Sequence, residues 1–175
     1  MKSIIYSLFL LLISLTCLAQ KGEYETVPDF GARFFSEPAK WQTLWINKAS
    51  REDIEQILGR RFSGLRIRYW GENNRSGWIF EEIGKEQPIT VGVIIEENAI
   101  TDVSVLAYRE SRGGEVRYPF FTEQFKQAVL KQNSSYQLDR HIDGITGATL
   151  SVRALKKIAT LALYCHQQTP FSVAN

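Results

Sequence analysis

The chain is poor in the residues that hold metals or form disulfides. Among 175 residues it has two cysteines, Cys17 and Cys165, and two histidines, His141 and His166, which are far apart in the sequence. No Cys-x-x-Cys-His is present, which excludes an attached c-type haem. So small a set of ligands, without the usual spacing, argues against a metal site.

Strong charge of either sign is also missing. The net charge is +2 and 23% of the residues are charged, whereas a nucleic-acid-binding protein normally has a concentrated basic face. We therefore expect no nucleic-acid partner. There is no Gly-x-Gly-x-x-Gly loop for a dinucleotide pyrophosphate either. With 44% hydrophobic residues, the length suits a single globular domain with a core of its own.

The first nineteen residues have the layout of a secretory signal peptide. Lys2 supplies a positive charge, residues 4–18 are almost uninterruptedly apolar, and Ala19 follows at a suitable cleavage position. The apolar run is shorter than the ~20 residues of a membrane-spanning helix, although an uncleaved anchor is the alternative. We expect an exported protein, periplasmic or otherwise extracytoplasmic. After cleavage Cys165 would be the only thiol, so no internal disulfide could form.

Residues 20–62 are expected to form an N-terminal helical extension. Ser36 can cap one helix, with Pro38 near its start and Trp41, Leu44 and Trp45 on one face. A second helix is expected from the Ser50 region, and Gly59 would end it.

From residue 63 to 170 the pattern predicts one further domain. Apolar residues alternate in four stretches around residues 65–69, 78–81, 89–95 and 103–107, separated by short turns. This is typical of an antiparallel meander. Helical periodicity follows at about 119–131, with Phe121 and Phe125 facing inward, and at about 150–167. The expected fold class is α+β, a small twisted antiparallel sheet with helices packed on one face.

The stretch with chemical content is residues 143–151, Asp-Gly-Ile-Thr-Gly-Ala-Thr-Leu-Ser. Gly144 and Gly147 bend the chain just before a helix, and Ala148 adds little bulk. Thr149 therefore stands at a helix start, where free amide N–H groups favour an anion such as a phosphate. Its hydroxyl is either an ordinary helix cap or an attachment point, and spacing alone leaves both open.

This stretch resembles the flavinylation motif of the FMN-binding domain family, which includes the C subunit of the Na⁺-translocating NADH:quinone oxidoreductase and the G subunit of the Rnf complex. The family pattern is Asp-x-x-(Ser/Thr)-Gly-Ala-Thr followed by Ser or Thr, here Asp143, Thr146, Gly147, Ala148, Thr149 and Ser151, with Leu150 between the last two. The resemblance implies that a flavin transferase, using FAD and Mg²⁺, attaches FMN to Thr149 through its phosphate, and that Asp143 serves recognition.

The likeness extends over roughly the second half of the chain. The family order places a loop like Tyr108 to Gly113 after two strands, and then Phe-x-x-Gln-Phe before the motif. It implies that the flavin ring lies near Tyr108, Glu110, Ser111, Gly113 and Gln124. Arg112 stands where the family often has proline, which leaves the flavin contacts of this loop open. Residues 20–88 match only loosely.

The resemblance implies an electron carrier rather than an enzyme acting on its own substrate. Its partners would be a membrane electron-transfer complex or cytochrome and an extracytoplasmic acceptor. The alternatives are an FMN-dependent reductase of a small molecule and an unmodified exported binding module. A reductase usually needs a positioned acid or base beside the ring, and the sequence offers no strong candidate.

Overall fold

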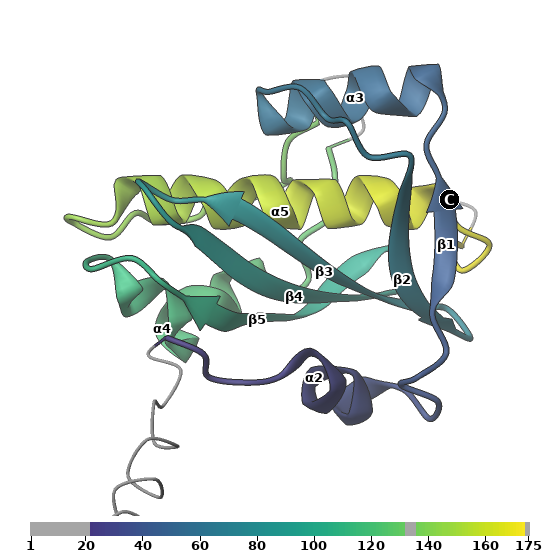
Figure 1. Ribbon diagram of the computed structural model, residues 1–175, viewed down its shortest axis with the longest axis horizontal. Coiled ribbons are helices and arrows are strands. Elements are labelled where there is room, and N and C mark those ends of the chain that lie inside the picture. The colour runs from purple at the N-terminus through teal and green to yellow at the C-terminus, as the bar shows by residue number, and fades with distance from the viewer. Residues whose placement is uncertain (1–21, 132–135, 174–175) are drawn as a thin grey trace, which may run out of the picture.

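A computed structural model describes residues 22–131 and 136–173. Its centre is one antiparallel sheet in which each strand pairs with the next along the chain (Figure 1). The strands are β1 (Gln42–Trp45), β2 (Arg66–Glu72), β3 (Arg75–Ile83), β4 (Pro88–Glu96) and β5 (Ala99–Tyr108). The predicted α+β class and the antiparallel meander are confirmed.

Strand β1 corrects the prediction of a helix beginning at Ser36. Gln42 to Trp45 pair with Tyr69 to Arg66 of β2, and burial alternates along these four residues as it does in a strand. Trp41 stacks on Trp70 with ring centroids 4.0 Å apart. Apolar residues at positions 41, 44 and 45 fit either period over so short a stretch, and pairing with β2 decides between them.

Helix α3 (Lys48–Leu58) confirms the second predicted helix of the N-terminal segment. Asn47, rather than Ser50, is its N-cap, and the two residues form a capping box. Gly59 ends the helix with φ 67°, in the left-handed region that glycine adopts freely. The capping box starts the helix one turn earlier than the sequence pattern indicates.

The predicted helix at 119–131 is too long. Helix α4 (Pro119–Thr122) is followed by one 3₁₀ turn, η3 (Glu123–Phe125), and the helical path ends there. Gln127 has φ 62° and donates its N–H to the Ile100 carbonyl at 2.7 Å, and the Ala128 carbonyl accepts from Ile100 N–H at 3.0 Å. Hydrogen bonds to β5 thus replace those of a longer helix, while Phe121 and Phe125 are buried as predicted.

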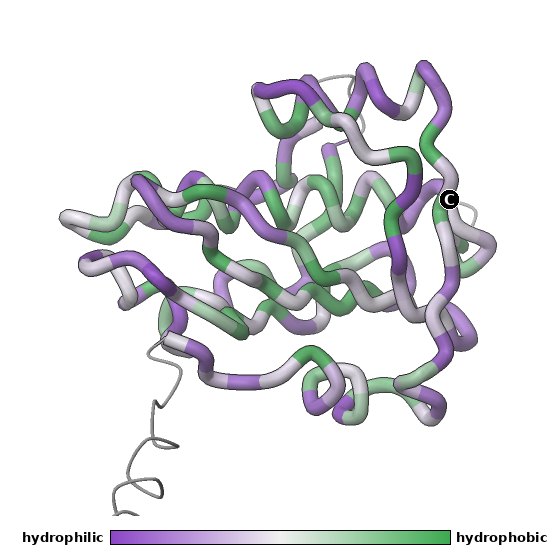
Figure 2. Tube along the Cα trace, viewed as in Figure 1, coloured by the Kyte–Doolittle hydropathy of each residue, from purple (hydrophilic) through white to green (hydrophobic). Residues whose placement is uncertain are grey.

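Helix α5 (Thr149–Gln167) confirms the last predicted helix and packs on one face of the sheet, against β3, β4 and β5. The α3 and α4 side chains Ile54, Leu58 and Phe121 belong to the same core. The hydrophilic colour of Figure 2 lies along the outer side of α3, at the top of the view. The predicted one-faced arrangement therefore describes these three helices.

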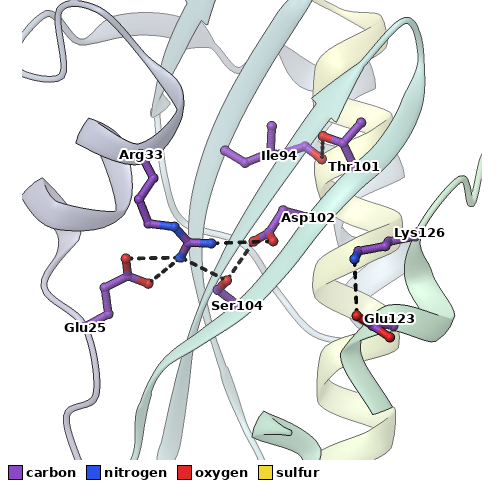
Figure 3. Close-up of polar contacts among 8 residues, drawn as sticks. All are labelled: Glu25, Arg33, Ile94, Thr101, Asp102, Ser104, Glu123 and Lys126. Carbon is purple, nitrogen blue, oxygen red and sulfur yellow. Dashed lines mark hydrogen bonds and ion pairs between the residues drawn. The ribbon is translucent and has the colours of Figure 1, made fainter. Parts of the chain in front are cut away.

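Helix α2 (Val27–Phe34) covers the opposite face. Phe30 packs there in a second core with Trp70, Ile94 and Leu106, strand residues that point away from α5. Arg33 of α2 joins Glu25 at 2.8 Å and Asp102 of β5 at 3.6 Å, and Ser104 lies beside them (Figure 3). The N-terminal segment thus adds strand β1 to the edge of the sheet and places helix α2 on one of its faces.

One buried polar cluster joins the far end of α5 to the sheet. His166 is 0% exposed, its Nδ1 lies 2.7 Å from Ser76 Oγ, and Trp78 Nε1 donates to that same oxygen at 2.7 Å. His166 Nε2 lies 3.2 Å from Asn98 Oδ1. Burial lowers the pKa of His166 to about 4, because the charged ring would be desolvated. His166 is therefore neutral in the folded protein near pH 7.

The signal peptide predicted at residues 1–19 lies outside the described residues. Across residues 22–131 and 136–173, no helix has the length and hydrophobicity to cross a membrane, and no three potential metal-ligating side chains gather. Cys165 is fully buried with a free thiol, and burial raises its pKa, so this thiol is unreactive in the folded state.

Candidate functional site

Helix α5 begins at Thr149 without a side-chain cap. Ala148 occupies the N-cap position, with φ −117°, and no side chain bonds to the first amides. Thr149 is the first helical residue, is exposed, and its hydroxyl has no hydrogen-bond partner among the described residues. The alternative in which Thr149 is the helix cap is therefore wrong. An exposed hydroxyl thus stands beside helix-start amides that no side chain caps.

The loop before the helix leaves that hydroxyl accessible. Gly147 has φ 82°, and a Cβ placed on Gly147 or on Gly144 would meet no atom within 4 Å. Thr146 is exposed, and the Asp143 side chain is 82% exposed, with its Oδ1 3.5 Å from His141 Nε2. A second protein can therefore reach this side of the motif.

The Gln124 side chain links the motif loop to η3. Its Oε1 accepts the Asp143 amide N–H at 2.7 Å, across nineteen residues of sequence. The side chain thus bonds to the backbone of the motif through its Oε1. This contact ties the loop to η3, whose Phe125 is fully buried in the core.

The loop after β5 meets the start of α5 at a buried junction. Tyr108 Oη lies 2.9 Å from Ser151 Oγ and donates to the Arg112 carbonyl. Burial raises the pKa of Tyr108 against the opposing effect of the Ser151 hydrogen bond, so the phenol stays protonated as a donor. Gly113, with φ 84°, packs against this pair. These contacts therefore fix the 108–113 loop, although it has Arg112 at the position where the family often has proline.

We expect Gly113→Ala to disrupt this junction. A Cβ at position 113 would lie 2.9 Å from Tyr108 Oη and 3.0 Å from Ser151 Oγ, in a left-handed backbone. Strain and crowding should together lower the free energy of unfolding by about 2 kcal/mol, measured by urea denaturation. Gly144→Ala, where nothing crowds the new Cβ, should stay within about 0.5 kcal/mol. Equal stability of the two variants would contradict the close packing of Gly113 against Tyr108 and Ser151.

Glu110 joins the same loop to the turn between β3 and β4. Its Oε1 accepts amide N–H groups from Lys85 at 2.5 Å, Glu86 at 2.6 Å and Gln87 at 3.0 Å. Desolvation raises the pKa of Glu110, but these three donors outweigh it and the pKa is lowered. The carboxylate is therefore ionised, and its Oε1 is engaged with three backbone N–H groups.

The β3–β4 turn, the loop after β5 and the start of α5 border an open groove of about 590 Å³ beside Thr149. Seven of the predicted site residues line it, together with Lys85 and Arg112. They are Glu110, Ser111, Gly147, Ala148, Thr149, Leu150 and Ser151. Tyr108 and Gly113 lie behind this wall at the junction, whereas Asp143, Thr146 and Gln124 are not among the residues that line the groove.

Lys85 is the groove residue that sequence reasoning missed. It lies in a turn that reads only as a break between strands, and nothing local links it to residues 147–151. The link is Glu110, and a contact across 25 residues leaves no periodic signal in the sequence.

Thr149 also borders a larger hollow of about 700 Å³ on the other side of α5. Three of the six α5 residues there are basic, namely Arg153, Lys156 and Lys157. None of the loop residues 108–113 contributes to this hollow. Thr149 thus stands between this hollow and the groove that contains Glu110 and Ser111, two of the predicted ring contacts.

The groove suits a flavin nucleotide. Helix-start amides and the basic side chains Lys85 and Arg112 favour the negative charge of a phosphate. Leu150 is 39% exposed beside them, an apolar surface against which a flat ring can pack. Because the groove is open, one edge of a bound ring would remain accessible to another protein.

Comparison with known proteins agrees with this geometry. Residues 84–164 match the model of the FMN-binding domain, from the β3–β4 turn to near the end of α5. A search of curated proteins found no match. The matched segment contains every residue that lines the groove, and the chain therefore carries in residues 84–164 a member of the FMN-binding domain family.

Proposed function

We propose that this protein is an exported flavoprotein that carries one FMN, esterified through its phosphate to Thr149, and passes electrons between a membrane donor and an extracytoplasmic acceptor. The observation that carries the proposal is the Thr149 hydroxyl, which is exposed and unbonded at an uncapped helix start beside the groove. FMN supplies reversible uptake of electrons when bound.

The attachment needs an enzyme, and we propose a flavin transferase that uses FAD and Mg²⁺. The Thr149 oxygen would displace AMP from the FMN phosphorus of FAD, forming one phosphoester bond, breaking the pyrophosphate bond and releasing the hydroxyl proton. Asp143, exposed on the outer side of the loop, is available for recognition by that enzyme. A covalent bond keeps the cofactor in place where free FMN is scarce.

A carrier fits this groove better than a small-molecule reductase. Among the described residues that line it, the titratable side chains are Lys85, Glu110 and Arg112. Glu110 is occupied by three backbone donors, and a general acid or base must be free to reach its substrate. The open groove favours electron exchange with a protein partner, such as a membrane cytochrome or electron-transfer complex.

The proposal is tested by producing the chain together with a flavin transferase and examining denatured protein in a gel. A fluorescent flavin band at the position of the chain is expected, and its absence would contradict covalent attachment. Carrier and reductase are then separated by kinetics. The carrier requires a partner protein for turnover, so steady reduction of a small molecule by the isolated holoprotein would favour the reductase.

A further inference from the structure

The β3–β4 turn is fastened to the flavin loop by a single carboxylate. Three consecutive amides, of Lys85, Glu86 and Gln87, point at Glu110 Oε1. The turn is closed on itself by Gly84 N–H and the Gln87 carbonyl at 3.1 Å. A Cβ on Gly84 would lie 3.0 Å from the same carboxylate oxygen. The turn therefore forms a fixed wall of the groove.

Lys85 brings a positive charge to that wall. Its side chain lines the groove together with Ser111, Arg112 and the first residues of α5. The Lys85 side chain is 74% exposed, and its ammonium lies 3.2 Å from Glu86 Oε1. Exposed pairs of this kind are weak and exchange readily with solvent. The Lys85 charge is thus available to a ligand in the groove.

We propose that Lys85 raises the reduction potential of the flavin in this groove, and that Glu110 is the positioning residue that holds Lys85 there. This inference rests on the proposed function. Uptake of two electrons and one proton, with electrons from the membrane donor, adds one negative charge to the ring. A nearby cation stabilises the reduced form more than the oxidised form, and the potential rises.

The test is a spectroelectrochemical titration of the flavinylated protein. Lys85→Gln should lower the midpoint potential, changing the ratio of oxidised to reduced flavin at a fixed potential by about threefold to tenfold. For a two-electron couple this is about 15 to 30 mV. The shift should shrink at high salt, because an exposed charge is screened. A change caused by a damaged fold would not respond to salt in this way.

Lys40→Gln is the matched control. The Lys40 side chain is 72% exposed and its Nζ lies 3.3 Å from Glu37 Oε2, so it forms a surface pair like that of Lys85. Neither Lys40 nor Glu37 lines the groove. The potential of this variant should equal that of the wild type. An equal shift in both lysine variants would show a general effect of surface charge and overturn the inference.

Glu110 variants test the positioning role. Glu110→Gln keeps an amide oxygen for the three N–H groups but removes a negative charge, so the potential should rise. Glu110→Ala also releases the turn, so in that background Lys85→Gln should shift the potential less than it does alone. A full shift there would refute the positioning role.

Intact mass is measured first on every sample. A wild-type protein without the flavin mass would overturn the proposed function and this inference together. Flavin-loaded wild type and Lys85→Gln with equal potentials would overturn this inference alone.

Discussion

Thr149→Ala is expected to abolish covalent flavin completely while leaving the fold intact. The bond requires the Thr149 hydroxyl, and alanine removes it. The hydroxyl has no partner among the described residues and the helix cap is Ala148, so its loss breaks no hydrogen bond there. We expect the free energy of unfolding to change by less than about 0.5 kcal/mol. Mass spectrometry and urea denaturation of the same sample check both parts.

Thr43→Ala is the control for this substitution. Thr43 is an exposed threonine on β1, outside the groove, and its loss should leave the flavin content unchanged. If Thr149→Ala retained the full complement of covalent flavin, the attachment site would lie elsewhere. If the same variant lost about 1 kcal/mol or more, Thr149 would act as the helix cap after all.

The second large effect is a loss of stability in acid through His166. Its pKa in the folded protein is about 4, below the value of ~6.5 for an unfolded chain. The unfolded state therefore binds a proton more readily, and the free energy of unfolding falls as the pH drops from about 6.5 towards 4. Between pH 7.5 and pH 5 this linkage amounts to about 2 kcal/mol. Urea denaturation across that range measures it.

His166→Gln should flatten the acid dependence, because glutamine does not titrate. The variant should be less stable at pH 7.5, since the contacts with Ser76 and Asn98 are altered. His141→Gln is the matched control, because the His141 side chain is 82% exposed, and it should follow the wild-type pH profile. An unchanged slope in His166→Gln would show that other groups cause the acid sensitivity.

Where a pattern was long and periodic, the sequence predicted the structure well. Strands β4 and β5 and helix α5 each extend over nine residues or more, so the apolar pattern of each repeats often enough to be recognised. The motif placed Thr149 at the start of α5, and the structure agrees. The helix end at Gly59 follows from the backbone freedom of glycine.

Short or long-range features could not be predicted in this way. Strand β1 has four residues, too few to separate the two periods. The helical path ends at Phe125, and Gln127 and Ala128 form hydrogen bonds with Ile100, which is distant in the sequence. Gln124 and Lys85 join the site through contacts with Asp143 and Glu110. Such contacts depend on the finished fold and leave no mark in neighbouring residues.

The most direct test is peptide mass mapping of the chain purified from a host with a flavin transferase. The peptide that contains Thr149 should gain about 438 Da, the mass of FMN less one water, with fragment ions that assign the gain to Thr149. An unmodified Thr149 peptide from such a host, with no flavin on any other peptide, would contradict the account of a covalent flavoprotein.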